Sequence, residues 1–367
     1  MGESKDFLLL LLSSVYGQHH CPSIPSLSNF VESARFGTEL AEGNKLAQRV
    51  TLEHIKQWLA EGRGCGHGSE YVPWIKIKKR GLPGKSNLQF RFIPELSRSG
   101  HLLSAGELHL VRLLFFLGVA DLREQFPCWP WPAPHPLHQH PNFNPRHLSW
   151  SKGTAAVAKK LGICHPRFPG TRLLHIPTID VLATIEAKPD YRAVAFSVKP
   201  DPTKSDLSEW DAAKLSIQEA YCWELNIPWS LISAQNIPAT LRENLRVLIH
   251  HSAPKPNLDE KLARFSELMT TTLVAGDAIE NCIQRTASHL DISVDLSLEL
   301  FHRALWRKAI PIDLRKPWVM REPAPLCDQT WIAATRHYLL EGVKYGHRSH
   351  HARAISLNRL ETLPDQQ

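Results

Sequence analysis

The sequence predicts an α/β domain followed by a helical region, and three observations carry this prediction. Residues 178–200 (TIDVLATIEAKPDYRAVAFSVKP) alternate apolar and polar side chains on either side of Pro189 and Asp190, which is the pattern of a β-hairpin. Helical patterns over 104–117 and 207–226 stand beside strand-like segments at 121–127 and 229–233. Beyond a proline-rich stretch at 252–257, the chain consists of helical segments.

The composition is typical of a soluble globular protein of more than one domain. The chain has 367 residues, of which 43% are hydrophobic and 22% charged, and a formal charge of +7 that favours a polyanionic partner. Its seven cysteines have no paired spacing, which argues against a disulfide framework or a zinc ribbon and favours a cytoplasmic location. The apolar run at 7–12 is too short to span a bilayer, so we expect no contact with a membrane.

Residues 1–45 show no strong periodicity and are expected to form an N-terminal extension. Thr51 is a candidate N-cap for a helix that ends at Gly62, and a glycine-rich loop (61–68) follows. In that loop Arg63 and His67 are the side chains able to meet a phosphate; the alternative is a flexible loop without a ligand. The basic run that includes Lys78, Lys79 and Arg80 is either a solvated strand face or a track for a DNA backbone.

The segment 104–117 begins with Ser104 and carries Glu107 three residues later, which fits a capping box. The alternative interpretation makes Glu107 an inward-facing carboxylate that shares a metal ion with Asp180, and the residues alone do not choose between the two. A strand is expected over 121–127. The proline-, tryptophan- and histidine-rich segment at 127–150 is expected to be an insertion, and 153–165 a small helix.

The hairpin is the centre of the functional hypothesis. With a short turn around Pro189 and Asp190, Asp180 is expected to lie opposite Lys199, with one face of the hairpin apolar and the other polar. A carboxylate that holds a divalent cation, beside an ammonium that orients water or offsets charge on a phosphate, is suited to phosphodiester hydrolysis. The alternative is an ordinary surface salt bridge between neighbouring strands.

The helix over 207–226 carries Glu219 off its apolar stripe, where a solvated helix charge is the alternative to a site residue. After the boundary at 252–257, helices at 277–290 and 295–307 and a wing strand at 310–314 have the outline of a winged helix-turn-helix. Helix pairs of this kind serve protein contacts as well as DNA binding, so both uses stay open here.

Several motifs, in order and at similar spacing, resemble those of the TnsA endonuclease family, which cuts the 5′ strand within heteromeric cut-and-paste transposases. They are 61–68 (EGRGCGHG) with 71–74 (YVPW), 101–104 (HLLS) with Glu107, 121–127 (DLREQFP), 197–200 (SVKP) and 226–229 (NIPW). The resemblance implies a restriction-endonuclease-like fold, a mixed sheet flanked by helices, over 46–252. It is weaker over 253–367, where it implies a winged-helix-like domain.

Carried over residue by residue, the resemblance assigns metal-binding carboxylates to Glu107 and Asp180 and the catalytic lysine to Lys199. It assigns a metal-binding backbone carbonyl to Val198 and a further acidic residue to Glu219. The superfamily often has an acid two positions before the lysine, whereas this chain has Ser197. We therefore expect its metal site to rely on the carbonyl instead.

The function that the resemblance implies is a Mg²⁺-dependent DNA endonuclease, with Mn²⁺ as a substitute, acting on the 5′ strand of transposon ends. Its expected partners are transposon-end DNA, a TnsB-like subunit that joins 3′ ends, and an ATP-dependent TnsC-like regulator reached through the C-terminal domain. The expected location is the bacterial cytoplasm, at the nucleoid. Two alternatives are a catalytically inactive module that bridges transposase partners and DNA, and a stand-alone restriction-like nuclease.

Overall fold

The structure is a computed structural model that describes residues 49–77, 88–138, 140–141, 148–187, 190–200, 208–233, 236–341 and 354–355. The strands are β1 (Gln89–Ile93), β2 (Arg98–Leu102), β3 (Asp121–Pro127), β4 (Ala133–Pro134), β5 (Trp150–Ser151), β6 (Thr178–Ala187), β7 (Asp190–Lys199), β8 (Trp229–Ser233) and β9 (Ala354–Ile355). The α-helices are α3 (Leu52–Ala60), α4 (Ala105–Phe116), α5 (Thr154–Leu161), α6 (Glu209–Glu224), α7 (Ala239–Leu248), α8 (Pro256–Val274), α9 (Ile279–Leu290), α10 (Val294–Trp306) and α11 (Thr330–Arg336). The expected α/β class is confirmed.

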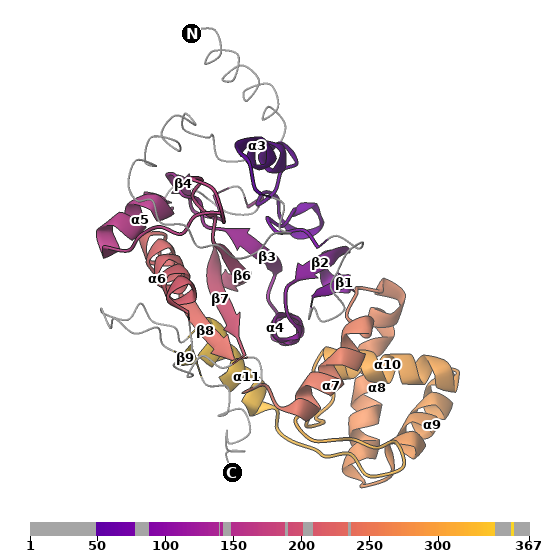
Figure 1. The fold of residues 1–367 in the computed structure, drawn as a ribbon. Helices are drawn as coiled ribbons and strands as arrows, with labels where there is room; N and C mark the ends of the chain where they lie inside the picture. The colour runs from indigo at the N-terminus through magenta and orange to yellow at the C-terminus, as the bar shows by residue number, and fades with distance from the viewer. Residues whose placement is uncertain are drawn as a thin grey trace.

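A mixed, open sheet forms the centre of the fold, in the order β3-β6-β7-β8-β9 within the described residues. β3, β6 and β7 are antiparallel neighbours, whereas β8 and β9 run parallel to β7. The parallel step is made by α6, which connects β7 to β8 as a crossover. α4 packs on one face of the sheet, and α6 with α5 lies on the other (Figure 1).

The expected hairpin exists, but its register differs by two residues from the expected one. Val181 pairs with Phe196, where the expected register pairs it with Val198, and Ala187 pairs with Asp190. The two connecting residues, 188 and 189, lie outside the described part of the chain. A shift by an even number of residues keeps every side chain on its predicted face, so the apolar face survives this correction.

The face of the hairpin that was expected to be polar and half-exposed is buried instead. Thr184 is 0% exposed and Ser197 is 1% exposed. Leu182, Ala193 and Ala195 of this face form a second apolar cluster with Tyr221, Cys222 and Leu225 of the α6 region. The predicted insertion contributes to this burial, since Leu137 joins the same cluster and Trp129 is buried next to it. Ser197 joins an internal hydrogen-bond network, whereas Thr184 Oγ1 is buried without a hydrogen-bond partner in the described part of the chain. These two polar positions therefore do not mark a solvated surface.

The C-terminal part contains α7 to α10, which form a group beside α4 (Figure 1). Phe116 of α4 contacts the rings of Trp306 and Trp331, so one apolar core continues from the sheet into these helices. In place of the expected wing strand at 310–314, Ile312 makes one isolated antiparallel bridge to Leu326. The winged-helix assignment and the domain boundary at 252 stay predictions. In the described part of the chain, no helix combines the length and apolar character that crossing a bilayer requires.

Candidate active site

Glu107 is placed by the first turn of α4. Ser104 is the N-cap, and its Oγ accepts a hydrogen bond from the Glu107 backbone N–H at 3.1 Å. The Glu107 carboxylate accepts from the N–H of Leu103 at 2.9 Å and from Ser104 Oγ at 3.1 Å. The Glu107 side chain therefore caps the helix through the N-cap hydroxyl of Ser104 and through the N–H of Leu103, the residue before the N-cap. It is also 4% exposed and points toward the sheet, where Gln125 Nε2 donates to Oε2 at 3.0 Å.

Asp180 lies near the start of β6, at the point where the backbone pairing of β6 with β7 ends. Its Oδ2 accepts a hydrogen bond from the backbone N–H of Val198 at 2.7 Å. This bond replaces a ladder hydrogen bond and places the Asp180 carboxylate beside the end of β7. The neighbouring residue Lys199 ends that strand, so the structure brings Asp180 and the predicted lysine into one site despite the shifted register.

Lys199 is held by the N-terminus of α6. Its Nζ donates to Asp211 Oδ1 at 3.0 Å, and the second oxygen of Asp211 accepts from the N-cap hydroxyl of Ser208 at 2.9 Å. Lys214 lies one turn further along α6. Burial raises the pKa of Asp180, and the charges of Lys199 and Lys214 oppose this rise. The site thus contains two lysines near one carboxylate, where the sequence predicted one.

A chain of buried hydrogen bonds connects Glu107 to the end of β7. Gln125 Oε1 accepts from Thr178 Oγ1 at 2.9 Å, and the carbonyl of Thr178 accepts from Gln218 Nε2 at 2.6 Å. Gln218 Oε1 then accepts from Ser197 Oγ at 3.0 Å. All four side chains are at least nine-tenths buried, so each amide and hydroxyl depends on its neighbour for a partner.

Gln125 has an unusual backbone conformation in the middle of β3. Its φ of 50° lies in the left-handed region, although the residues on both sides of it pair regularly with β6. Glu124 pairs with Val181 and Phe126 with Ile179, so Gln125 lies across the sheet from Asp180. Non-glycine residues adopt this conformation infrequently and at a cost in free energy. Here it turns the amide of Gln125 toward Glu107.

The pKa values of both carboxyl groups are raised. Burial raises that of Glu107 from 4.5 to about 8, and the nearby Asp180 carboxylate adds to the shift. Burial also raises the pKa of Asp180 from 3.8 to about 6, although the Val198 N–H and the two lysines oppose the shift. Both shifts favour the retention of a proton by the pair in the folded protein. Two carboxyl groups that repel each other in a buried site form an arrangement that a divalent cation stabilises.

The donor set fits a small, hard cation. Glu107 and Asp180 supply carboxylate oxygens and Val198 can supply its backbone carbonyl. Mg²⁺ is commonly bound by one or two carboxylates while it keeps several waters. The described residues contain no group of three or more His, Cys, Asp or Glu side chains placed to hold a metal. A site made of two carboxylates and a carbonyl suits a cation that also binds water and substrate.

The role of Glu219 in the site stays a prediction. Glu219 is half-buried on α6, and burial is the cause that raises its pKa. The α6 side chains that reach the site are instead Asp211, Lys214 and Gln218, spaced by three and four residues on one face. The spacing of these polar residues on one face of the helix that follows Lys199 is visible in the sequence and could have indicated their role.

Arg63 and His67 are engaged in contacts within the protein. Arg63 donates to Glu61 at 2.9 Å and to the Trp74 carbonyl at 3.2 Å, and His67 lies 3.3 Å from Asp121. The glycine-rich loop around them packs closely, because a Cβ on Gly64 would come within 2.4 Å of Pro127. The backbone room expected for a ligand is thus occupied by the protein itself at this glycine. The other predicted DNA-binding residues, Lys78, Lys79 and Arg80, lie outside the described residues.

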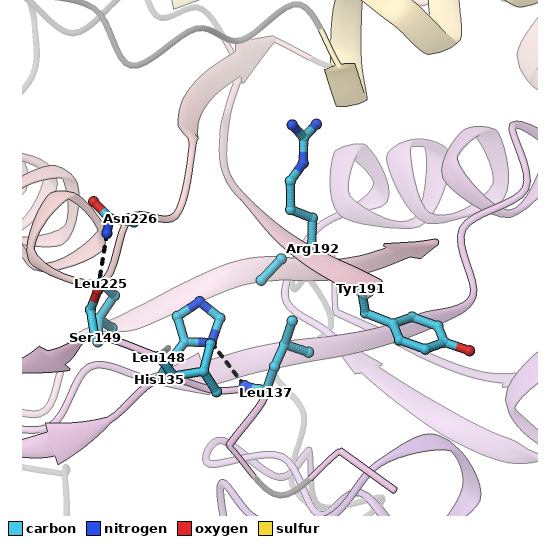
Figure 2. Close-up of a pocket in the computed structure, with 9 residues that line it drawn as sticks. His135, Leu137, Leu148, Ser149, Tyr191, Arg192, Leu225 and Asn226 are labelled. Carbon is cyan, nitrogen blue, oxygen red and sulfur yellow. Dashed lines mark hydrogen bonds between the residues drawn. The ribbon is translucent and has the colours of Figure 1, made fainter. Parts of the chain in front are cut away.

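A cavity of about 140 Å³ lies at the other end of β7 from Lys199. Figure 2 shows His135 and Leu137 of the insertion on one side of it and Asn226 with Ser149 on another. Among the described residues its lining contains no carboxylate, so this cavity does not belong to the carboxylate site. The lining residues are His135, Leu137, Leu148, Ser149, Tyr191, Arg192, Ala193, Leu225 and Asn226.

No family model matches the chain. It is similar to the transposon Tn7 transposition protein TnsA of Escherichia coli, with 29% identity over 245 residues. The aligned region covers 66% of this chain and 78% of that protein. The resemblance expected from the motifs is therefore confirmed, at modest identity.

Proposed function

The chain is TnsA-like, and from this premise we propose that it is the DNA endonuclease subunit of a transposase, acting with other transposase subunits. The finer proposal is that it hydrolyses the 5′ strand at transposon ends and depends on Mg²⁺, which Mn²⁺ can replace. The observation that carries the proposal is the pair formed by the buried Glu107 and the partly buried Asp180, with raised pKa values, next to Lys199. A surface salt bridge would not account for these values, because it lowers the pKa of its acid.

In this mechanism Glu107, Asp180 and the Val198 carbonyl would hold the cation. A divalent cation bound there supplies positive charge against the phosphate and lowers the pKa of a water molecule. Lys199 would orient the attacking water or stabilise charge on the phosphate, and Asp211 fixes the direction of its ammonium group at 3.0 Å. Gln125 and Gln218 would hold the two sides of the site at a fixed separation. Glu219 stays a predicted site residue through the family resemblance.

The partners of the proposed function are transposon-end DNA, a TnsB-like subunit that joins 3′ ends and a TnsC-like ATP-dependent regulator bound through the C-terminal region. The region over 46–252 would be the restriction-endonuclease-like catalytic domain, and 253–367 the winged-helix-like one. These proposals follow from the family resemblance and from the charge of +7. The cytoplasm, at the nucleoid, is the corresponding location.

The test is strand-specific mapping of cuts on labelled element-end DNA, with Mg²⁺ and the partner subunits present. We expect Asp180→Ala to abolish the 5′-strand cut while 3′ joining continues. Glu186→Ala is the matched control, because Glu186 lies on the same strand and is exposed. Unchanged cutting by Asp180→Ala would favour the assembly module, and cutting by the chain without partners would favour the stand-alone nuclease.

A further inference from the structure

A cluster of arginines is formed by residues of α4, α7 and β1, and α4 and α7 pack against each other (Figure 1). Arg112 on α4 is 9% exposed, and the charges of Arg246 on α7 and Arg91 on β1 act on it. Arg242 of α7 and His109 of α4 adjoin it. The acidic group that acts on this cluster is Glu243, which pairs with Arg246 at 2.7 Å. Four arginines thus face one carboxylate.

Several polar atoms of this cluster lack partners. Within the described part of the chain, the Nε atoms of Arg112 and Arg242 and Nδ1 of His109 are buried and make no hydrogen bond. Burying a guanidinium without full pairing, next to like charges, costs free energy. Burial, and to a smaller extent the charges of Arg242 and Arg112, lower the pKa of His109 to about 4, so its imidazole is neutral at physiological pH. An anion bound at this cluster would accept the missing hydrogen bonds and offset the positive charge.

We propose that Arg91, Arg112, Arg242 and Arg246 form a binding site for the phosphate backbone of duplex DNA. The planar guanidinium matches phosphate oxygens and stays charged, which suits it to this ligand. Arg112 lies five residues after Glu107 on α4, which corresponds to about 7.5 Å along the helix axis. That length equals about two base steps of a duplex, at roughly 3.4 Å each. Five residues also turn by about 140° around the helix axis, so the cluster contacts phosphates on another side of α4 from the bond cut at the carboxylate site.

This inference rests on the proposed function only for the position of the cut; the phosphate site itself is tested by binding alone. The assay measures the affinity of the full chain for a fluorescein-labelled duplex of random sequence, by fluorescence anisotropy in EDTA over a range of KCl concentrations. The variants are Arg112→Gln and the double variant Arg91→Gln with Arg246→Gln. The double variant changes only exposed side chains, so we expect it to fold. It therefore tests the site even if Arg112→Gln does not fold. Arg321→Gln is the control, because Arg321 is 87% exposed on another part of the surface.

We expect the slope of log affinity against log salt to fall by about 0.9 for each phosphate contact removed, and to stay unchanged in Arg321→Gln. An unchanged slope in Arg112→Gln and in the double variant would refute the site. If these variants keep the native slope but no longer bind a partner subunit, the arginines bind an acidic protein segment and the proposal is wrong. Asp180→Ala separates the two proposals, since it should keep the slope. If the native chain does not cut transposon ends but the cluster variants still lose slope, the proposed function fails and the phosphate site stands.

Discussion

Replacing Glu107 by glutamine tests whether the charge of this carboxylate destabilises the folded protein. Glutamine can keep the hydrogen bonds of the cap. Its amide oxygen can accept from the N–H of Leu103 and from Gln125, and its NH₂ group can face Ser104 Oγ. The substitution therefore removes the charge and leaves the capping geometry in place.

The size of the expected change in unfolding free energy follows from the raised pKa of Glu107. Because the folded protein raises it from 4.5 to about 8, the native state binds this proton more tightly than the unfolded chain does. Between these two values unfolding releases a proton, so the stability of the native protein falls as the pH rises. At 1.36 kcal/mol per pH unit, the accumulated loss of stability above pH 8 is on the order of 5 kcal/mol. Glutamine does not titrate and escapes this loss.

The assay is denaturant unfolding in EDTA at about pH 5 and about pH 9, pH values near the two ends of this window. We expect Glu107→Gln to be nearly as stable as the native chain at the lower pH and more stable by about 2–4 kcal/mol at the higher pH. Mg²⁺ should stabilise the native chain at the higher pH and have no such effect on the variant. Glu186→Gln, an exposed change on β6, controls for a general effect of charge. If Glu107→Gln has the same effect on stability at both pH values, the charge of Glu107 does not destabilise the folded protein and a cation has no repulsion to relieve at this site.

Three further predictions concern the neighbours of this pair. Gln125→Leu should weaken Mn²⁺ binding, measured by calorimetry, by about 10- to 100-fold, because Glu107 loses the donor that orients it; unchanged Mn²⁺ affinity would show that Gln125 only supports the fold. Lys199→Met should lower the rate of 5′-strand cutting by about 100-fold or more without weakening DNA binding, and cutting at the native rate would remove Lys199 from the mechanism. Gln218→Leu should lower the cutting rate more than Glu219→Gln does, because Gln218 bonds both Thr178 and Ser197; the reverse order would restore Glu219 to the site.

The secondary structure and the faces of the hairpin could be predicted from local patterns. Ser104 begins α4 and Gly162 ends α5, as their side chains and backbone preferences indicate. The register of the hairpin could not be predicted, because the sequence around Pro189 allows turns centred at different positions. An error of two residues kept the two faces intact and moved the predicted partner of Asp180 along the strand.

The network behind the carboxylates could not be predicted because its members are ordinary polar residues in the sequence. Gln125 looks like any polar position of a strand, and nothing local indicates a φ of 50° there. Gln218 and Ser197 come together only when α6 packs against the sheet. The burial of this face likewise depends on α6 and on the insertion, which are tertiary features. The sequence pattern therefore suggested single site residues, such as Asp180 and Lys199, but not the hydrogen bonds that surround them.

The contrast between two neighbouring acids shows why Glu107 and Asp180 are the pair suited to a cation. Glu124 on β3 is 0% exposed, and Arg98 donates to both of its oxygens at 2.7 and 2.8 Å, so its charge is neutralised within the protein. Its neighbour on the same strand, Gln125, supplies only a neutral amide to Glu107. An amide orients a carboxylate without cancelling its charge, and the repulsion between Glu107 and Asp180 therefore persists in the folded protein. Glu124 is thus held in a structural ion pair, and we propose that Glu107 of α4 and Asp180 of β6 are the acids that bind the divalent cation.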